Sequence, residues 1–535
     1  MKKLLAAIVM AASLLSCINV NEGVGGDYIA TNQKYDFYTV EFDLDEVLMK
    51  PVDSLSAYSS RRINFGSIRD DTYGLMKRGC VVTLVPVLDT LDFGTDPVFK
   101  RFCFRAAVDT ISVGDLGQSN ILQNVNVYAL TEPLDENEYF ARTEIKHGSK
   151  RITKGVPVLN GADSLSFDFT AEFGKRYFSI TQEDLEDFDQ YCKKFPGIYL
   201  TTDDPIGNGG RFNMFEMDIL ELVTTSSTSY LERTDNFASL SFSSIYDGER
   251  RDTSFMFYYS PPEFQDLDSL YSATSLPDQY VFNVDYHESD GLSGMADDKV
   301  YIEGGSGLKP VVPATEIRRL INAEISSKGG DPQTALISKA TLELPFEFPD
   351  DYKSMYLFPK VLSPTVKIST DTTVTFAGLT DASASSENQG DINRSLCNYA
   401  PDITHHAQQI IRQTDENLDD YDIWFLIMWN ETTTSTNSDA SALAEYYQQI
   451  AYYSYYNQLY GGYGGYGYGS SSYYGSGYSN YYSYMMMAQY AASAATSTYS
   501  SSELDKDRYY NCYLNGPGAS GNKPKLKVTF ALPKE

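Results

Sequence analysis

The sequence predicts a mainly β protein with two antiparallel β-sandwich domains of jelly-roll type, a few short helices and one long Tyr/Gly-rich loop. Two observations carry this prediction. Short runs rich in Val, Phe and Tyr recur along the chain, and Gly, Pro, Asp and Asn separate them. Hydrophobic residues make up 42% of the 535 residues, which is enough to bury cores. We place the first domain at 35–300 and the second at 301–535.

The N-terminal residues follow the order of a bacterial lipoprotein signal. Two lysines precede the apolar run Leu4–Leu15, which ends at Ser16 and Cys17. This run is too short to cross a bilayer core of about 30 Å as a helix. We therefore expect residues 1–16 to be removed, Cys17 to be lipidated, and 17–34 to form a tether. A secretory signal cut after Ser16 without lipidation is the alternative.

The net charge of −30 and the cysteine pattern argue against several classes of function. Such an acidic surface repels phosphate backbones, so we expect no nucleic-acid partner and a membrane attachment that depends on the lipid. Lipidation of Cys17 leaves five of the six cysteines, an odd set without C-x-x-C spacing. That pattern is not typical of a disulfide framework or a metal site. The longest later apolar run, Ile423–Trp429, is far below the roughly 18 residues of a membrane span.

The strands predicted for the first domain alternate apolar and polar residues or form short apolar runs. They are Phe37–Leu44, Val81–Val87, Val98–Ala107, Val125–Leu130, Arg176–Ile180, Phe195–Leu200, Phe212–Val223, Phe237–Ile245, Ser254–Tyr259 and Tyr280–Tyr286. One helix is predicted over Gln182–Lys194, because Leu185, Phe188 and Cys192 fall on one stripe.

The second domain is predicted to contain two helices. The first covers Ala314–Ile325, where Thr315 is the candidate N-cap and Glu316 in the first turn suits the helix dipole. The second covers His405–Leu418. Strands are predicted at Val300–Glu303, Lys339–Leu344, Asp422–Asn430, Arg508–Leu514 and Lys525–Phe530.

Residues 446–502 differ from the rest of the chain. They contain no charged residue and include 18 of the 43 tyrosines, with many Gly and Ser residues. Predicted strands lie on both sides, so we interpret the segment as a long insertion in the second domain. Lengthening a loop costs little stability, about 0.6 kcal/mol for each doubling. The segment is either a low-complexity disordered loop or a contact surface, since Tyr, Gly and Ser are typical of binding loops.

The candidate interaction residues are aromatic. In the insertion they are Tyr452, Tyr453, Tyr455, Tyr456, Tyr460, Tyr463, Tyr466, Tyr468, Tyr473 and Tyr474. Trp424 and Trp429, five apart in a predicted strand, are expected to face opposite sides of the sheet. One belongs to the core on this view, and the other is a candidate platform for a sugar.

Six short sequence segments occur in an order that resembles one protein family. They are Asn64–Gly74, Val127–Leu134, Phe195–Tyr199, Tyr301–Leu308, Lys339–Leu342 and Pro524–Phe530, after the lipoprotein signal and with the Tyr-rich loop before the last. Together they resemble the Bacteroidota lipoprotein family catalogued as domain of unknown function 4270. The resemblance covers nearly all of the mature chain and implies a mostly β outer-membrane lipoprotein. It carries over no catalytic residue.

No catalytic or metal signature stands out. His405 and His406 are adjacent, so on a helix they point apart, and His287-Glu288 lacks the second histidine of a zinc helix. The segment from Asp415 opens like a calcium loop but lacks the glycine and the final glutamate that an EF-hand needs. A looser calcium site there, or around Asp290, Asp297 and Asp298, stays open. The Gly462–Gly467 match to a dinucleotide motif has no strand-then-helix context.

We therefore expect a lipid-anchored protein without cofactor or catalytic activity, on the outer membrane and at the cell surface, with the periplasmic face as the alternative. The first hypothesis is an accessory or scaffold subunit of an outer-membrane protein complex that uses the Tyr-rich loop as its contact surface. The second is a surface protein that binds glycans. The third is a hydrolase, which would need a concave pocket with converging carboxylates or a metal.

Overall fold

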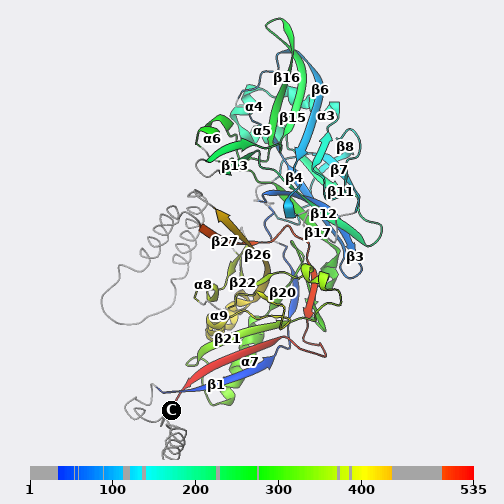
Figure 1. The fold of residues 1–535 in the computed structure, drawn as a ribbon. Coiled ribbons are helices and arrows are strands. Elements are labelled where there is room, and N and C mark those ends of the chain that lie inside the picture. Colours follow the sequence, from blue (N-terminus) through cyan, green and yellow to red (C-terminus); the bar gives the residue numbers. More distant parts are fainter. Residues whose placement is uncertain are drawn as a thin grey trace, which may run out of the picture.

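The computed structural model describes residues 34–534 except 54, 58–59, 88–89, 112–120, 135–139, 225–228, 274–275, 370–373, 385–387 and 436–496. Figure 1 shows an elongated molecule. Strand β1 (Tyr35–Asp43) lies at one end, here called the β1 end, and the hairpin of β15 (Ala238–Tyr246) and β16 (Glu249–Tyr259) lies at the other, here called the β15 end. The predicted mainly β class is confirmed, since the described strands pair antiparallel and the longest described helix has 14 residues.

Two large sheets and three helices form the β1 end. The five-stranded sheet has the order β1, β29 (Lys525–Pro533), β21 (Leu336–Pro345), β25 (Asn398–Tyr399) and β24 (Ile392–Asn393). The seven-stranded sheet has the order β18 (Gly294–Met295), β2 (Leu48–Pro51), β20 (Leu308–Val312), β26 (Ile423–Ser435), β22 (Val361–Ser369) and β23 (Val374–Gly378), with β27 (Ser497–Leu504) on β26. Strands β19 (Lys299–Glu303) and β28 (Asn511–Asn515) form a pair of their own. The helices are α7 (Ala314–Ser327), α8 (Asp381–Ala384) and α9 (Thr404–Arg412), and 3₁₀ turns lie at η6 (Tyr352–Leu357) and η7 (Asp415–Tyr421).

The β15 end also has two large sheets. The eight-stranded sheet has the order β12 (Gly209–Glu216), β3 (Arg62–Asp70), β4 (Gly74–Val82), β11 (Ile198–Thr202), β7 (Gln123–Leu130) and β8 (His147–Arg151), with β17 (Phe282–His287) on β4 and β9 (Val158–Leu159) on β7. The five-stranded sheet has the order β10 (Leu165–Asp168), β6 (Thr95–Ala106), β15, β16 and β5 (Leu84–Pro86). A small hairpin joins β13 (Leu220–Thr224) and β14 (Ser229–Arg233). The helical segments are α3 (Ala171–Arg176), η4 (Tyr177–Ser179), α4 (Gln182–Glu186), α5 (Phe188–Lys194), α6 (Leu267–Ala273) and η5 (Glu288–Leu292).

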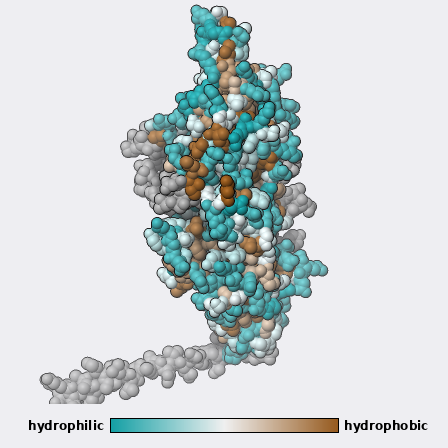
Figure 2. Space-filling view, turned by 90° about the vertical axis from the view of Figure 1, so that its right-hand side faces the viewer, coloured by the Kyte–Doolittle hydropathy of each residue, from teal (hydrophilic) through white to brown (hydrophobic). Residues whose placement is uncertain are grey.

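Each end has its own hydrophobic core. At the β15 end, residues such as Phe65 and Val127 of the eight-stranded sheet pack with Phe102 and Phe242 of the five-stranded sheet. At the β1 end, both large sheets and helices α7 and α9 contribute to one cluster. A third, smaller cluster joins the two ends. Figure 2 shows one long face of the molecule, which is mostly hydrophilic, with hydrophobic side chains gathered about halfway along it.

The third cluster explains the longest apolar run of the sequence. Phe425 and Ile427 of β26 point into the core of the β1 end, while Trp424 and Leu426 point into the cluster between the ends. The strand is therefore buried on both faces, and such strands read as continuous apolar runs. None of the helices in the described ranges is long and apolar enough to cross a membrane.

Two of the three predicted helices differ from the structure. The segment Gln182–Lys194 forms two helices, α4 and α5, because Asp187 leaves the helical conformation and its carboxylate accepts from the Gln190 N–H as the N-cap of α5. The segment His405–Leu418 is α-helical only to Arg412 and ends in a 3₁₀ turn.

Helix α7 begins at Ala314, so the prediction of Thr315 as N-cap was wrong. The N-cap position is Pro313, which offers no side-chain acceptor. Glu316 does lie in the first turn, where its carboxylate accepts from the Asp45 N–H at 2.9 Å.

The strands of the predicted first domain do not all pair with one another. Strand β1 pairs with β29 along its whole length, from Tyr35 opposite Pro533 to Asp43 opposite Lys525. Strand β2 pairs with β20. Residues 35–51 therefore lie in sheets of the β1 end, and the strands of the β15 end begin at Arg62. Hydrophobic patterning predicts that a strand exists but not which distant strand it joins.

The Tyr-rich segment lies between two paired strands. Strands β26 and β27 pair from Met428 opposite Leu504 to Ser435 opposite Ser497. Residues 497–502, at the end of the predicted insertion, are therefore part of a strand. Residues 436–496, and with them all ten candidate tyrosines, lie outside the described residues.

Candidate functional site: a buried charged junction

A cluster of buried charged side chains lies where the two ends of the molecule meet. It is built around the turn from β19 to β20, whose sequence is Glu303-Gly304-Gly305-Ser306-Gly307. Strand β17 of the eight-stranded sheet faces this turn and contributes Asp285 and His287. The side chains of Glu303 and His287 are 0% and 1% exposed. We call this cluster the charged junction.

The buried side chain of Lys309 bonds to the backbone of this turn. Its Nζ donates to the carbonyl oxygens of Glu303 at 2.6 Å and of Gly305 and Gly307 at 3.0 Å each. Only the ammonium form has three N–H donors, so these acceptors select the charged lysine. Burial lowers the pKa of Lys309 to about 7, although the nearby carboxylates of Glu303 and Asp285 oppose that effect.

His287 bridges two carboxylates. Its Nε2 lies 3.1 Å from Asp285 Oδ2, and its Nδ1 lies 3.2 Å from Glu303 Oε1. Burial alone lowers the pKa of His287, but the two carboxylates outweigh it and raise the pKa above its ordinary value. For Asp285, burial raises the pKa, and His287 together with Arg78 outweighs it, so the net pKa is well below its usual range. The imidazolium and the carboxylate thus hold each other ionised.

Serine and arginine side chains complete the junction. The Ser306 Oγ donates to Asp285 Oδ1 at 2.5 Å, and the Ser289 Oγ donates to the Glu303 carboxylate. Arg142 donates to the Ser306 carbonyl at 2.9 Å and binds both carboxylate oxygens of Asp290. Two parallel N–H···O bonds of this kind fix the geometry as well as the charge.

The glycines of the turn are required by close approach. A Cβ on Gly305, where φ is +54°, would lie 2.0 Å from Asp285 Oδ2. A Cβ on Gly307 would lie 2.8 Å from His287 Nδ1. A side chain at either position would push the turn away from β17. The segment Gly304–Gly307 is therefore the part of the turn that contacts β17.

Arg78 of β4 connects the junction to the segment after β27. Its guanidinium donates to the backbone carbonyls of Asp507 and Arg508 and lies 4.2 Å from the ring centroid of Phe212. Arg508 in turn stacks on Trp429, with Cζ 3.3 Å from the ring centroid. Arg78 therefore attaches residues 507 and 508, which follow β27, to the eight-stranded sheet.

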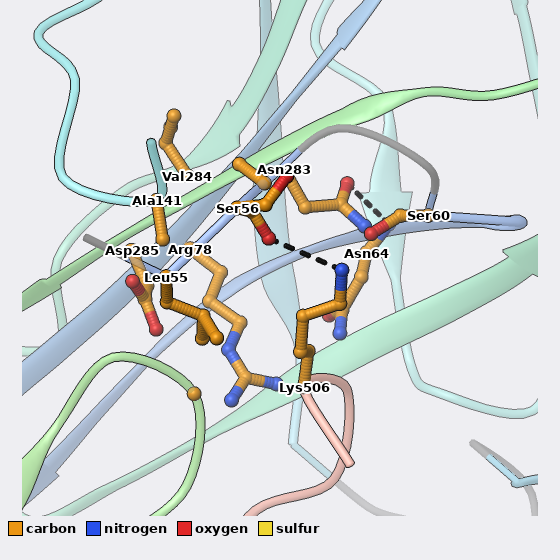
Figure 3. Close-up of a pocket in the computed structure, with 12 residues that line it drawn as sticks. Leu55, Ser56, Ser60, Asn64, Arg78, Ala141, Asn283, Val284, Asp285 and Lys506 are labelled. Atoms are coloured by element: carbon orange, nitrogen blue, oxygen red, sulfur yellow. Dashed lines mark hydrogen bonds between the residues drawn. The ribbon is translucent and has the colours of Figure 1, made fainter. Parts of the chain in front are cut away.

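A small cavity lies beside Arg78, and Figure 3 shows the residues that line it. The Lys506 Nζ donates to the Ser56 carbonyl at 3.1 Å, and the Asn64 N–H donates to Asn283 Oδ1 at 3.4 Å. The solvent-accessible volume is about 20 Å³, room for little more than one water molecule. A cavity of this size does not hold an organic substrate.

The side chains of the charged junction do not form a nucleophile–base pair. Catalysis by a serine needs its hydroxyl to donate to a free histidine nitrogen. Here both nitrogens of His287 face carboxylates, and the hydroxyls of Ser289 and Ser306 donate to carboxylates instead. Within the ranges that the structure describes, no group of three or more His, Cys, Asp or Glu side chains is arranged to hold a metal. The arrangement can fix the two ends of the molecule to each other.

The two tryptophans lie in different surroundings. Trp424 is 6% exposed, and its ring meets Phe376, Lys50 and Lys367. Trp429 is half-buried, and Lys360 and Arg508 both contact its ring. Neither ring is an open sugar platform in the described residues. Cys17 and the ten tyrosines lie outside the described residues.

The charged junction was not predicted as a site. From the sequence, His287 is assigned only to an incomplete zinc motif, and the Tyr301–Leu308 segment only to a strand and to the family resemblance. Two signals were present in the sequence: Asp285 and His287 alternate toward one face of a strand, and three glycines surround Ser306. Comparisons with protein-family models, curated proteins and solved structures find no match to this chain.

Proposed function

We propose that this protein is a lipid-anchored, non-catalytic lipoprotein of the outer membrane, exposed at the cell surface, that acts as an accessory or scaffold subunit of an outer-membrane protein complex. The observation that supports this most is the β26–β27 hairpin. It carries the Tyr-rich segment between two strands that pair up to Ser435 and Ser497. The segment is therefore joined at both of its ends to paired strands.

The base of the hairpin is fixed to the rest of the molecule. The Asp505 N–H donates to the Ile427 carbonyl at 2.9 Å, and Arg508 stacks on Trp429. The Asp505 carboxylate accepts from Arg508 at 2.9 Å and from the Tyr510 hydroxyl at 2.7 Å. A rigid base favours binding because less conformational freedom is lost when a partner is bound.

The chemistry of the charged junction supports a structural role for that cluster. The charged side chains of the charged junction bond to one another and to the backbone of their own chain. The glycan-binding alternative receives no support from the tryptophans, since one is buried and the other is contacted by two cations.

Deletion of residues 436–496, with Ser435 and Ser497 joined by a two-residue Asn-Gly turn, tests the role of the loop. The deletion keeps every described pair of the hairpin. We expect the melting temperature to stay within a few degrees and the partners that co-purify from detergent-solubilised membranes to be lost. A control variant changes the ten candidate tyrosines to Phe, which keeps the rings and removes the hydroxyls. Recovery of the same partners at the same yield after the deletion would contradict the proposed contact surface.

Lipidation has a separate test. The variant Cys17→Ser removes the only acceptor for the acyl chains at the predicted cleavage site. We expect it to appear in the soluble fraction and to lose metabolic labelling with a palmitate analogue. Equal membrane retention of the variant would overturn the anchor.

A further inference from the structure

A pocket lies beside the eight-stranded sheet, where β7 begins and β11 leads into β12. Its walls come from residues 121–124, at the start of β7, and from residues 203–210, which connect β11 to β12. The pocket has a volume of about 360 Å³, which is in the size range of small-molecule sites. We call it the β11–β12 pocket.

The polar side chains of the pocket are held in place by their own chain. Gln123 is buried, and both its amide nitrogen and its amide oxygen form hydrogen bonds within the sheet. Asp203 Oδ1 accepts from Asn126 Nδ2 at 2.8 Å, and Asp203 Oδ2 accepts from Asn124 Nδ2 at 2.9 Å. These two amide donors lower the pKa of Asp203 below its ordinary value. The carboxylate is therefore fixed and ionised, and each of its oxygens has a second lone pair for a ligand.

The charges of the pocket are already balanced. Asp204 Oδ1 accepts from Lys77 Nζ at 2.7 Å, and the Arg151 guanidinium lies 3.7 Å from Asp203. A cationic ligand therefore finds no unpaired carboxylate, and no lysine or arginine is among the described residues that line the pocket to receive an anion. As stated above for the described ranges, no group of three His, Cys, Asp or Glu side chains is arranged for a metal. The pocket thus favours a neutral polar ligand over an ionic one.

The same face of the sheet carries stacked rings. Side chains alternate along β7, so Asn124, Asn126 and Tyr128 share one face. Tyr128 pairs with Tyr199 of β11, and the exposed His147 ring stacks on both, with centroid distances of 4.6 and 5.2 Å. Tyr128 lies four residues from Asn124, which is about 13 Å along the strand. Flat rings near fixed amides and carboxylates suit a sugar, whose C–H faces pack on rings and whose hydroxyls bond to planar polar groups.

We propose that the β11–β12 pocket binds a neutral carbohydrate, whose hydroxyls bond to Asp203 and Asn208 and whose chain continues toward Tyr128 and His147. The carboxylate accepts from the hydroxyls, and the exposed amide of Asn208 both donates and accepts. Leu122, which is 72% exposed, offers an apolar contact at the pocket wall. The site does not depend on the accessory function proposed above, because it uses neither the Tyr-rich segment nor the lipid.

An array of neutral and acidic glycans tests the site, with the full-length protein in a detergent that has no sugar headgroup. We expect the wild-type protein to bind at least one neutral glycan. We expect Asp203→Ala to weaken that binding about tenfold or more and Asn208→Ala about threefold or more. Asn208 is exposed in a loop, so its variant serves if Asp203→Ala does not fold. Asp252→Ala is the matched control, because it removes another exposed carboxylate that pairs with a lysine, and it should change binding by less than about twofold.

Two solution conditions separate a neutral carbohydrate from an ionic ligand. Salt screens the attraction between exposed charges, so we expect the affinity to change by less than about twofold between about 0.1 M and about 1 M NaCl. We also expect binding to persist in EDTA, which removes divalent cations. A steep fall of affinity with salt would show that the ligand is charged, and loss of binding in EDTA would show that a metal mediates it. Either result would overturn the inference.

The two proposals fail in different ways. If the wild-type protein binds no neutral glycan, or if Asp203→Ala and Asn208→Ala bind it as well as the wild-type protein does, the carbohydrate site is wrong. The accessory function then still stands, because its test is the loss of protein partners when residues 436–496 are deleted.

Discussion

His287 lies between two buried carboxylates, with Nε2 at 3.1 Å from Asp285 and Nδ1 at 3.2 Å from Glu303. A neutral imidazole has one N–H donor, so both contacts are hydrogen bonds only when the ring is protonated. The histidine is therefore a cation that belongs to the fold. It joins β17, from the eight-stranded sheet, to the turn that leads into β20.

This arrangement predicts a pH dependence of stability. The folded-state pKa of His287 is raised above the ordinary value of 6.5. The stabilisation is therefore complete below about pH 6.5 and is lost as the pH rises through the folded-state pKa. We expect His287→Gln to lower the free energy of unfolding by about 3–5 kcal/mol at about pH 6 and by less at alkaline pH. Urea unfolding at several pH values measures the difference, with exposed His147→Gln as the control. If the difference in the free energy of unfolding between the wild-type protein and His287→Gln does not change with pH, His287 does not bridge the two carboxylates as a cation.

Lys309 should be as important as His287. Replacing it by Met leaves three buried carbonyls without their donor and removes one of the two cations near the Glu303 carboxylate, the other being His287. We expect a loss of about 3–5 kcal/mol in the free energy of unfolding. The same substitution at exposed Lys353 should change it by less than about 0.5 kcal/mol. Equal effects of the two substitutions would show that Lys309 does not hold the turn.

A methyl group added at Gly305 should weaken the contact between the turn and β17 and lower the stability of the protein. The Cβ would lie 2.0 Å from Asp285 Oδ2, and the backbone has a positive φ of 54°. We expect Gly305→Ala to cost about 2–4 kcal/mol by thermal or urea unfolding. Gly329→Ala is the matched control, because φ is also positive there, at +78°, and nothing lies within 4 Å of its added Cβ. Unchanged stability of Gly305→Ala would mean that the turn does not contact β17 so closely.

Trp424 should act as a core residue. Its ring is 6% exposed and packs in the cluster between the two ends. We expect Trp424→Ala to lower the free energy of unfolding by about 3–5 kcal/mol and Trp424→Phe by less. A glycan array on the folded Trp424→Phe variant should match that of the wild-type protein. Loss of glycan binding without loss of stability would restore the sugar-platform interpretation.

Local patterns predicted the strands better than their partners. The alternation in Phe37–Leu44 and Lys525–Phe530 predicts both strands to within a few residues, yet no local signal shows that they pair with each other. Helix Gln182–Lys194 was predicted as continuous because its apolar stripe is continuous. Asp187 interrupts it because its side chain caps the second half. Local capping outweighed the periodic pattern there.

The charged junction escaped prediction for a related reason. Its members come from β4, β17, η5, β19, the turn after it, β20 and a loop near residue 142, and their charges come together only after folding. In the sequence they are isolated ionisable residues among 72 acidic and 42 basic ones. Burial strengthens the interactions among these charges and shifts their pKa values, and burial depends on the whole fold.

The pairing of β1 with β29 has a consequence for biogenesis. Strand β29 lies between β1 and β21, so it is the central element that both neighbours need. Strand β1 therefore cannot enter its sheet until residues 525–533 have been synthesised. A chain that is cut short before β29 leaves β1 and β21 without the strand that joins them. The five-stranded sheet can therefore form only after translation of nearly the whole chain.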